Sequence, residues 1–424
     1  MTRMQVPGDK SLTHRALMIA ALADGVSRLS GLLAGEDARA TARVLRELGV
    51  AVPPLPPGAE PIEVVGGGLH GLRAPGTTLD CANSGTTARL MLGILAGLPF
   101  RSVLAGDASL SARPMRRVTE PLSMMGARFT ELGPPDRLPI AVEGGRLGSL
   151  DFESPRASAQ VKSAILLAGV TGGAYVRVTE PSCSRDHTER LLAAAGVELD
   201  RGDLDDGRYT VELTPPDRLD PLEFRVPGDF SSAAFFLAFA ALAAAAPLRI
   251  EGVGVNPGRV GLLAVLRRMG AAVILERERT EAGEPVADLV AGRADLRATE
   301  VGADEIPNMI DEVPILAILA SRAHGETRIT GATELRVKES DRLAMMARNL
   351  RAVGVEAEEL PDGIVVRGTD RPLQGRIEAA GDHRIAMAFG VLGALPGNHI
   401  VIDDPHVADV SFPEFWTRLR ACAA

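Results

Sequence analysis

Lysine is rare in this sequence: of its 46 basic side chains, only Lys10, Lys162 and Lys338 are lysines, and the others are arginines. An ammonium is compact and can lose its proton, whereas a guanidinium is planar and stays charged. A lysine kept in an arginine-rich sequence therefore suggests a position at which arginine cannot do the chemistry. The alternative is a solvated or structurally paired cation, and for Lys162 we prefer that interpretation.

Lys10 belongs to the segment VPGDKSLTHR (6–15), in which a Pro-Gly turn leads into an apolar helical stretch. The segment places Lys10, Ser11 and Arg15 around the start of a helix. Free backbone N–H groups and the helix dipole favour an anion at such a position. An ordinary Ser or Thr cap with a solvated arginine is the alternative. The convergence of Gly, Lys and Ser favours an anion site.

Two further segments of the first half join small donors or cations to a helix start. NSGTT (83–87) offers backbone donors, and Gly85 permits the close approach of a ligand. ARPMRRV (112–118) carries Arg113 directly before a proline and outside the helix proper, so that its side chain is free to reach a ligand. Taken singly, each segment also fits a plain helix cap or a solvated face.

Hydroxyl, amide and imidazole groups open two more helices. Ser158 and Gln160 precede an apolar run, and these groups suit a polyol or sugar-like substrate. Arg185 and His187 open the next helix. We expect no metal at His187, because no second histidine lies at a ligand spacing from it.

The second half of the chain adds carboxylates to its cations. Asp311 stands just before the apolar stretch 313–320, where it is either a helix cap or a base that orients a hydroxyl. Lys338 and Arg342 are four residues apart, which predicts one shared helical face. A surface salt-bridge ladder is the alternative there. Arg384 begins another apolar helix.

Helix starts with cations or small donors thus occur in both halves of the chain. If their N-termini point at a common region, they create an electropositive cleft in a protein of net charge −9. A cleft of this kind suits a substrate with more than one anionic group.

The elements that must position these residues repeat along the chain. A leucine-rich helical segment, a glycine and a β-rich run recur five times, with the glycines at 49, 126, 196, 270 and 354. Each glycine falls where a left-handed C-cap is needed before a strand. The stretch 411–424 begins a sixth copy. We therefore predict six α/β units, arranged as a domain of three units used twice, although such punctuation also occurs in other α/β proteins.

The tetrapeptide VPGD occurs twice, at 6–9 and at 226–229. Two copies of one turn suggest two equivalent crossings between the halves. The predicted domains are 9–226 and 1–8 together with 227–424. Two crossing strands form a hinge, and a hinge suggests a cleft that closes.

Composition limits the remaining classes of protein. The sequence is 46% hydrophobic and 24% charged, as in ordinary globular proteins. Its longest apolar run, 233–246, is too short for a membrane span and predicts a buried helix. Three cysteines without C-x-x-C spacing, and no signal-peptide pattern, favour the cytoplasm. The negative net charge argues against a nucleic-acid partner.

Eight segments, in chain order, resemble the signatures of the 5-enolpyruvylshikimate-3-phosphate (EPSP) synthase family: PGDKSLTHR, NSGTTARL, ARPMRRV, SAQVKSA, RDHTERL, IDEVPILA, RVKESDRL and DHRIAM. The resemblance covers essentially the whole chain. It implies an α/β fold of two similar domains, each of three βαβαββ units (an inside-out α/β barrel), with six units in total and a two-strand hinge. It also implies a transferase of the shikimate pathway, which leads to chorismate and the aromatic amino acids.

The resemblance further implies the substrates shikimate 3-phosphate and phosphoenolpyruvate, no metal or organic cofactor, no membrane partner, and a monomer. Shikimate 3-phosphate would be bound by Lys10, Ser11, Arg15, Ser158, Ala159, Gln160, Arg185, Asp311 and Lys338. Phosphoenolpyruvate would be bound by Lys10, Gly85, Arg113, Gln160, Arg342 and Arg384.

Three residues take catalytic roles by the same resemblance. Asp311 matches the proton acceptor at the 5-hydroxyl. Glu339 matches the carboxylate that moves a proton at the methylene carbon, and Lys10 shares that role. No role is carried over to Glu334 or Val410, where members of the family vary. The implied mechanism is addition followed by elimination through a tetrahedral adduct.

Two rival functions remain. A UDP-N-acetylglucosamine enolpyruvyl transferase has the same fold, but its characteristic cysteine is missing from the matching loop, 106–117. A non-catalytic, anion-binding repeat protein is the other. Asp311 and Glu339 argue against it, because carboxylates placed among the cations would not help a protein that only binds anions.

Overall fold

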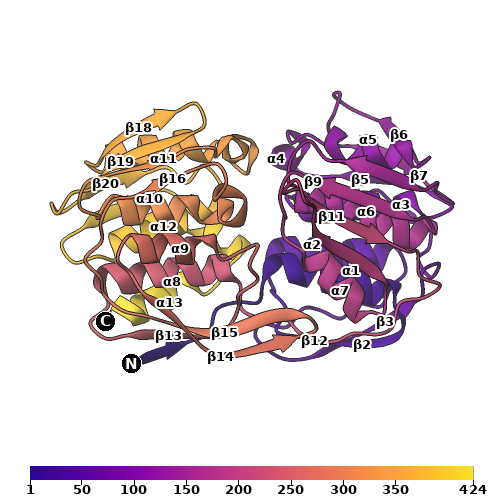
Figure 1. The fold of residues 1–424 in the computed structure, drawn as a ribbon, viewed down its shortest axis with the longest axis horizontal. Coiled ribbons are helices and arrows are strands. Elements are labelled where there is room, and N and C mark those ends of the chain that lie inside the picture. The colour runs from indigo at the N-terminus through magenta and orange to yellow at the C-terminus, as the bar shows by residue number, and fades with distance from the viewer. Residues whose placement is uncertain (424) are drawn as a thin grey trace. The chain divides into compact units, whose positions relative to one another are not determined.

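The structure, a computed structural model that describes residues 1–423, divides the chain into two compact units (Figure 1). The N-terminal unit comprises Gly8–Val226 and Thr280–Glu284. The C-terminal unit comprises Met1–Pro7, Pro227–Arg279 and the chain from Pro285 onward. Each unit is an α/β assembly of small sheets and helices, so the predicted fold class is confirmed.

The unit boundaries differ from the sequence prediction at two places, Gly8 and the segment 280–284. Gly8 belongs to the N-terminal unit, where its backbone lies so close to Gly31 that a Cβ atom would stand 1.8 Å from the Gly31 oxygen. The segment 280–284 is the tip of a hairpin. It belongs to the N-terminal unit because Arg190 donates to the Gly283 carbonyl (2.6 Å) and His187 Nδ1 lies 2.8 Å from Glu284 Oε1.

Three sheets form the N-terminal unit, with strand orders β12-β2-β3, β4-β5-β7-β6 and β8-β9-β11-β10. Each sheet combines one parallel pair with antiparallel neighbours. The strands are β2 (Asp24–Ser30), β3 (Ile62–Gly67), β4 (Leu79–Asp80), β5 (Arg101–Ala105), β6 (Arg128–Glu131), β7 (Ile140–Glu143), β8 (Leu150–Glu153), β9 (Val176–Glu180), β10 (Leu199–Asp203), β11 (Tyr209–Leu213) and β12 (Glu223–Arg225).

The C-terminal unit repeats this plan with the orders β1-β13-β15-β14, β16-β17-β19-β18 and β20-β21. Its strands are β1 (Thr2–Met4), β13 (Leu248–Gly254), β14 (Val273–Glu281), β15 (Glu284–Ala291), β16 (Glu300–Val301), β17 (Glu326–Ile329), β18 (Glu356–Leu360), β19 (Gly363–Arg367), β20 (Gln374–Ile377) and β21 (His399–Ile402). All six sheets are open, and no strand within residues 1–423 closes a barrel. The sequence prediction named a barrel, and the structure has no closed barrel among these sheets.

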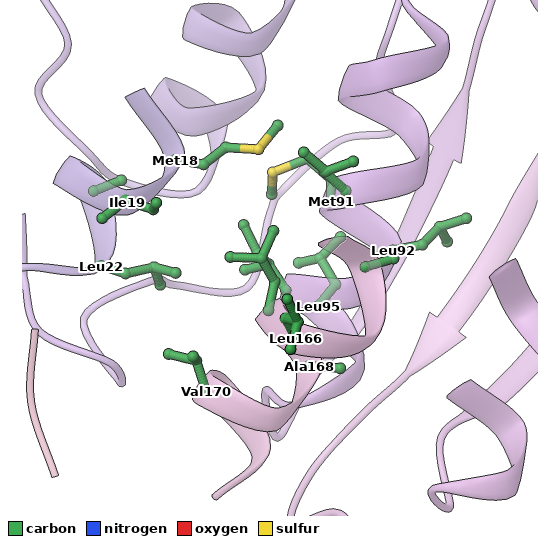
Figure 2. Packing of buried hydrophobic residues seen from close by; sticks show 14 of the residues in the cluster. Met18, Ile19, Leu22, Met91, Leu92, Leu95, Leu166, Ala168 and Val170 are labelled. Atoms are coloured by element: carbon green, nitrogen blue, oxygen red, sulfur yellow. The ribbon is translucent and has the colours of Figure 1, made fainter. Parts of the chain in front are cut away.

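Six helices are buried along most of their length and form the centre of the units: α1 (Lys10–Leu22), α3 (Gly85–Ala96), α6 (Ala159–Gly172), α8 (Phe230–Ala243), α10 (Val313–Ala320) and α12 (His383–Gly393). Figure 2 shows side chains of α1, α3 and α6, among them Met18, Met91 and Leu166, converging in one cluster. In the C-terminal unit Phe236 packs against Phe412 and Phe415, with ring centroids 5.7 and 5.8 Å apart. Close packing of this kind fixes the axis of each buried helix, and hence the position of its N-terminus.

Six amphipathic helices accompany the buried ones: α2 (Glu36–Glu47), α5 (Arg116–Met124), α7 (His187–Ala194), α9 (Gly261–Arg268), α11 (Arg342–Ala352) and α13 (Phe415–Ala423). Glycines follow the first five, and all five have positive φ, between 85° and 110°. Helix α13 occupies the sixth place. The predicted sixfold repeat is confirmed, since each unit contains three pairs of one buried and one amphipathic helix. The short elements are α4 (Ala108–Ser111), η1 (Ile306–Asn308), η2 (Ile310–Glu312), η3 (Thr333–Val337) and η4 (Pro405–Val410).

Both VPGD turns end in the N-cap of a buried helix. Asp9 Oδ1 accepts a hydrogen bond from Leu12 N (2.9 Å), and Asp229 Oδ1 accepts one from Ser231 N (2.7 Å). The turns follow β1 and β12 and lead into α1 and α8. Each copy thus leads from a strand of one unit to the first buried helix of the other.

The apolar run 233–246 lies mainly in α8, whose residues are buried from Phe230 to Ala241. Of the helices within residues 1–423, none is long and apolar enough to cross a membrane.

Candidate active site

The N-termini of the three buried helices of the N-terminal unit are tied together by side-chain hydrogen bonds. Arg89 of α3 donates to Gln160 Oε1 of α6 (2.7 Å), and Gln160 donates to Thr86 Oγ1 (3.1 Å). Arg15 of α1 donates to Ser163 Oγ of α6 (2.9 Å). The helix starts that carry Lys10, Gly85 and Ser158–Gln160 therefore lie at one end of the unit. We call this end the N-terminal half-site.

Lys10 is the first residue of α1, and its Nζ lies 2.9 Å from Asp37 Oδ2, in the first turn of α2. The ammonium is mostly buried, with 17% of its side chain exposed. Asp37 orients the lysine, so Asp37 belongs to the half-site although the sequence analysis did not single it out.

Arg15 is almost fully buried, and its guanidinium donates to neutral acceptors: Thr188 Oγ1 (2.7 Å), Ser163 Oγ (2.9 Å) and the Ser11 carbonyl (3.0 Å). Burial lowers the pKa of Arg15 to about 10, while Glu189 and Asp9 act in the opposite direction. A buried guanidinium held by hydroxyls and a carbonyl gains from a bound anion.

Two guanidiniums flank the first residue of α3. A Cβ atom on Gly85 would lie 3.2 Å from Arg89 Nη1 and 3.4 Å from Arg113 Nη1. Arg113 precedes α5, as predicted, and donates to Asn83 Oδ1 and to Ser109 Oγ (3.2 Å). The helix N-terminus and two arginines thus gather positive charge that suits a small carboxylate or phosphate.

Ser158 occupies the N-cap position of α6 without a capping hydrogen bond from its side chain, and its backbone N–H donates to Glu180 Oε1 (2.7 Å). Arg185 lies just before α7 and is partly exposed. Lys162 is fully buried and ion-paired with Glu180 and Glu189, so it is a paired cation and not a solvated one.

Asp311 is the centre of the second group of candidates, in the C-terminal unit. It lies on η2, directly before α10, as predicted. Three guanidiniums surround its carboxylate: Arg342 Nη1 (3.4 Å) and Arg384 Nε (3.7 Å) at Oδ1, and Arg259 Nη1 (3.6 Å) at Oδ2. The carboxylate thus lies among three cations, with only 14% of its side chain exposed.

Arg342 connects Asp311 to the other carboxylates of this region. It is 1% exposed, and it pairs with Asp382 (Nε–Oδ2, 2.8 Å) and with Glu339 (Nη2–Oε2, 2.7 Å). Its burial rules out the surface salt-bridge ladder that was the alternative for this segment. Asp311, Glu339, Arg342 and Arg384 are thereby brought together, and we call them, with Lys338, the C-terminal half-site.

Lys338 does not share a helical face with Arg342, so that prediction is wrong. Helix α11 begins only at Arg342, because the Asp341 side chain caps it by accepting from Ala344 N (3.1 Å). Lys338 has an extended backbone after η3. Burial lowers the pKa of Lys338, although Asp311 and Glu334 act in the opposite direction.

Four residues of the half-sites were not predicted as site residues from the sequence: Asp37, Arg89, Arg259 and Asp382. Arg89 did leave a signal, since it is a cation within an otherwise apolar helix. Arg259 left none: it donates to Asp229 Oδ1 (3.1 Å), thirty residues earlier, and only the fold brings it to Asp311.

His14, one turn beyond Lys10, has a buried ring whose Nδ1 lies 2.6 Å from Thr41 Oγ1. Burial lowers the pKa of His14 from 6.5 to about 3, with Asp37 acting in the opposite direction and Lys10 and Arg15 adding to the lowering. Between pH 6.5 and about 3, His14 is therefore protonated in the unfolded chain but neutral in the folded protein. The stability from this group is complete above pH 6.5 and falls as the pH drops towards 3.

Because of His14, we expect the free energy of unfolding to fall by about 2 kcal/mol when the pH is lowered from about 7 to about 5. His14→Gln removes the titrating ring and should remove that part of the pH dependence. Urea unfolding followed by far-UV circular dichroism, at both pH values and on both proteins, measures the difference. Equal pH dependence in the two proteins would contradict the assignment.

His187 contacts Glu284 and was not expected to bind a metal. Residues 1–423 contain no group of three or more His, Cys, Asp or Glu side chains arranged to hold a metal ion.

Comparison with known proteins identifies one family. The family model described as EPSP synthase (3-phosphoshikimate 1-carboxyvinyltransferase) matches residues 2–419. The chain is 46% identical over 418 residues to a 3-phosphoshikimate 1-carboxyvinyltransferase of Desulforamulus reducens, covering 98% of this chain and 96% of that protein. It is 49% identical over 415 residues to the enzyme of that name from Xanthomonas euvesicatoria, covering 98% and 92% of the two chains.

Solved structures agree with these relatives. An EPSP synthase from Acinetobacter baumannii superposes with a TM-score of 0.86 at 41% identity, covering 100% of this chain and 95% of that one. The enolpyruvyl transferase NikO from Streptomyces tendae superposes with a TM-score of 0.77 at 18% identity, covering 100% and 94%, which shows a shared fold.

Proposed function

The chain belongs to the EPSP synthase family, and we propose that the two half-sites carry out the reaction of that family with the residue roles given below. The reaction transfers the enolpyruvyl group of phosphoenolpyruvate to the 5-hydroxyl of shikimate 3-phosphate and releases phosphate, within the shikimate pathway of aromatic amino acid biosynthesis. The family match over nearly the whole chain favours this function over a UDP-N-acetylglucosamine enolpyruvyl transferase and over a non-catalytic anion binder.

In the N-terminal half-site, Lys10, Ser11, Arg15, Ser158, Ala159, Gln160 and Arg185 bind shikimate 3-phosphate. The support is chemical: Arg15 is a buried cation beside hydroxyls, and Ser158 and Gln160 stand at a helix start that favours a phosphate. The α3 start, with Gly85 and Arg113, binds phosphoenolpyruvate together with Lys10 and Gln160.

In the C-terminal half-site, Arg342 and Arg384 bind phosphoenolpyruvate, and Asp311 and Lys338 bind the shikimate ring. Asp311 accepts the proton of the 5-hydroxyl as that oxygen attacks C2 of phosphoenolpyruvate. The methylene carbon C3 takes a proton from Glu339, with Lys10 sharing the role, and a tetrahedral adduct results. Loss of a C3 proton then expels phosphate and leaves the enol ether.

One observation carries these roles: an aspartate at a helix start is surrounded by three guanidiniums in a mostly buried position. The cations stabilise the negative charge that develops on the phosphate and carboxylate groups, and the aspartate remains a base. We further propose that the protein acts as a cytoplasmic monomer and that no metal or organic cofactor takes part.

Purified protein given both substrates should release phosphate at an undiminished rate in the presence of EDTA. Either substrate alone should release none, which excludes a contaminating phosphatase. A colorimetric phosphate assay with both single-substrate controls measures this. Absence of release with both substrates, or release that EDTA abolishes, would contradict the proposal.

A further inference from the structure

A buried charge cluster lies beneath the shikimate 3-phosphate residues of the N-terminal half-site. Lys162 Nζ lies 2.9 Å from Glu180 Oε2, 2.9 Å from Glu189 Oε1 and 3.2 Å from the Ser184 carbonyl. The three side chains of the ion pairs are at most 1% exposed. The Tyr209 ring covers the ammonium, with its centroid 5.1 Å from Nζ. Three oxygen atoms thus lie within 3.2 Å of the ammonium nitrogen.

Glu180 joins this cluster to the substrate-binding segments. Its Oε1 accepts from Ser158 N (2.7 Å), at the start of α6, and its Oε2 accepts from Ser184 Oγ (2.6 Å). Ser184 directly precedes Arg185. One carboxylate therefore connects the two segments that carry Ser158 and Arg185.

The ammonium is what allows two carboxylates to be buried side by side. Burial opposes its charge, but attraction to Glu189 and Glu180 and the hydrogen bonds to both raise the pKa of Lys162 above its ordinary value. Without the cation, one carboxylate must take up a proton or move away from the other. A protonated or displaced Glu180 no longer accepts from Ser158 and Ser184 with the present geometry.

We propose that Lys162 is a positioning residue for the phosphate group of shikimate 3-phosphate, acting through Glu180 on the segments of Ser158 and Arg185. This inference rests on the proposed function, because it takes from there the assignment of both segments to shikimate 3-phosphate. Lys162 itself does not touch the substrate. The compact ammonium also accounts for a lysine here in a sequence so rich in arginine, since a larger, planar guanidinium would not fit between two buried carboxylates 2.9 Å from one nitrogen.

Lys162→Met keeps the length of the side chain and removes the charge. We expect the Km for shikimate 3-phosphate to rise at least about tenfold, because displaced phosphate ligands lose the binding energy of the ground state. At saturation kcat should stay within about threefold, because Asp311 does not contact this cluster. The Km for phosphoenolpyruvate should rise clearly less than that for shikimate 3-phosphate, because only Gln160 of its assigned ligands adjoins Ser158. Calorimetric titration with shikimate 3-phosphate should show the same loss of affinity without any turnover.

Val142→Ala is the matched control, because it tests whether a destabilised fold by itself raises the Km for shikimate 3-phosphate. Val142 is fully buried in β7, in a different sheet of the same unit. Its truncation lowers the thermal midpoint but should leave both Km values unchanged. A folded Lys162→Met protein with a normal Km for shikimate 3-phosphate would overturn the inference and leave the proposed function intact.

Should Lys162→Met fail to fold, Glu180→Gln decides the question. The amide keeps the shape of the side chain but offers one acceptor and one donor, so it cannot accept from both Ser158 and Ser184. The same selective rise in the Km for shikimate 3-phosphate is expected, and an unchanged Km overturns the inference. Wild-type protein that binds no shikimate 3-phosphate would overturn both the inference and the proposed function.

Discussion

Asp311→Ala lowers kcat by about three orders of magnitude, whereas the dissociation constant for shikimate 3-phosphate changes by less than about fivefold, if Asp311 is the base. The carboxylate lies among Arg259, Arg342 and Arg384. It is the group of the C-terminal half-site that we assign to the proton of the 5-hydroxyl. Its removal leaves the phosphate ligands of the N-terminal unit in place, so binding is largely preserved.

The measurement pairs steady-state turnover with calorimetric titration of shikimate 3-phosphate. Asp295→Asn is the control, since Asp295 is an exposed aspartate of the same unit that pairs with His324. It should behave like the wild type. Equal losses of turnover and binding in Asp311→Ala would make Asp311 a binding residue only.

Lys10→Arg should lower kcat/Km by about two orders of magnitude even though it keeps the positive charge. Lys10 begins α1, and its ammonium is held 2.9 Å from Asp37 in a mostly buried position. A guanidinium is larger and planar, so it displaces either Asp37 or the substrate groups that Lys10 contacts. It also cannot take part in proton transfer at C3, because it does not lose its proton.

Arg39→Lys is the matched control for this exchange. Arg39 lies on the neighbouring helix α2 and pairs on the surface with Glu36. The reverse exchange at that place should leave kinetics unchanged. Near-normal kinetics of Lys10→Arg would show that the charge alone matters and that the argument from the rarity of lysine is wrong.

Much of the fold could be predicted because it depends on local signals. The five glycines that end amphipathic helices all have positive φ, which L-amino acids with a side chain rarely adopt. The spacing of these glycines, together with the helix start in 411–424, predicted the six repeats. The place of Arg113 before α5, and of Asp311 before α10, followed from proline and from the start of an apolar run.

What could not be predicted depends on contacts between distant residues. Asp37 reaches Lys10 from another helix, and Arg259 reaches Asp311 from another repeat. The tip of the β14–β15 hairpin joins the N-terminal unit through Arg190 and His187, and no local pattern records that contact. The prediction that Lys338 and Arg342 share a helical face was wrong for a local reason. Asp341 caps α11, so the helix begins after Lys338.

The position of Lys162 shows how one pattern can have two outcomes. The rarity of lysine suggested a special role for a lysine in general, whereas for Lys162 a solvated or structurally paired cation was the preferred interpretation. Lys10 is partly exposed in its half-site, whereas Lys162 is fully buried between two carboxylates. The sequence could separate these cases only through the neighbours Glu180 and Glu189, which lie in other elements.

The proposed reaction requires that the C2–O bond of phosphoenolpyruvate breaks, after the 5-hydroxyl of shikimate 3-phosphate has added to C2. Phosphoenolpyruvate with ¹⁸O in its bridging position tests this directly, by mass spectrometry of the phosphate released in the presence of shikimate 3-phosphate. We expect the phosphate to carry the label and the enol ether to carry none. Labelled pyruvate together with unlabelled phosphate would show cleavage of the P–O bond and would contradict it.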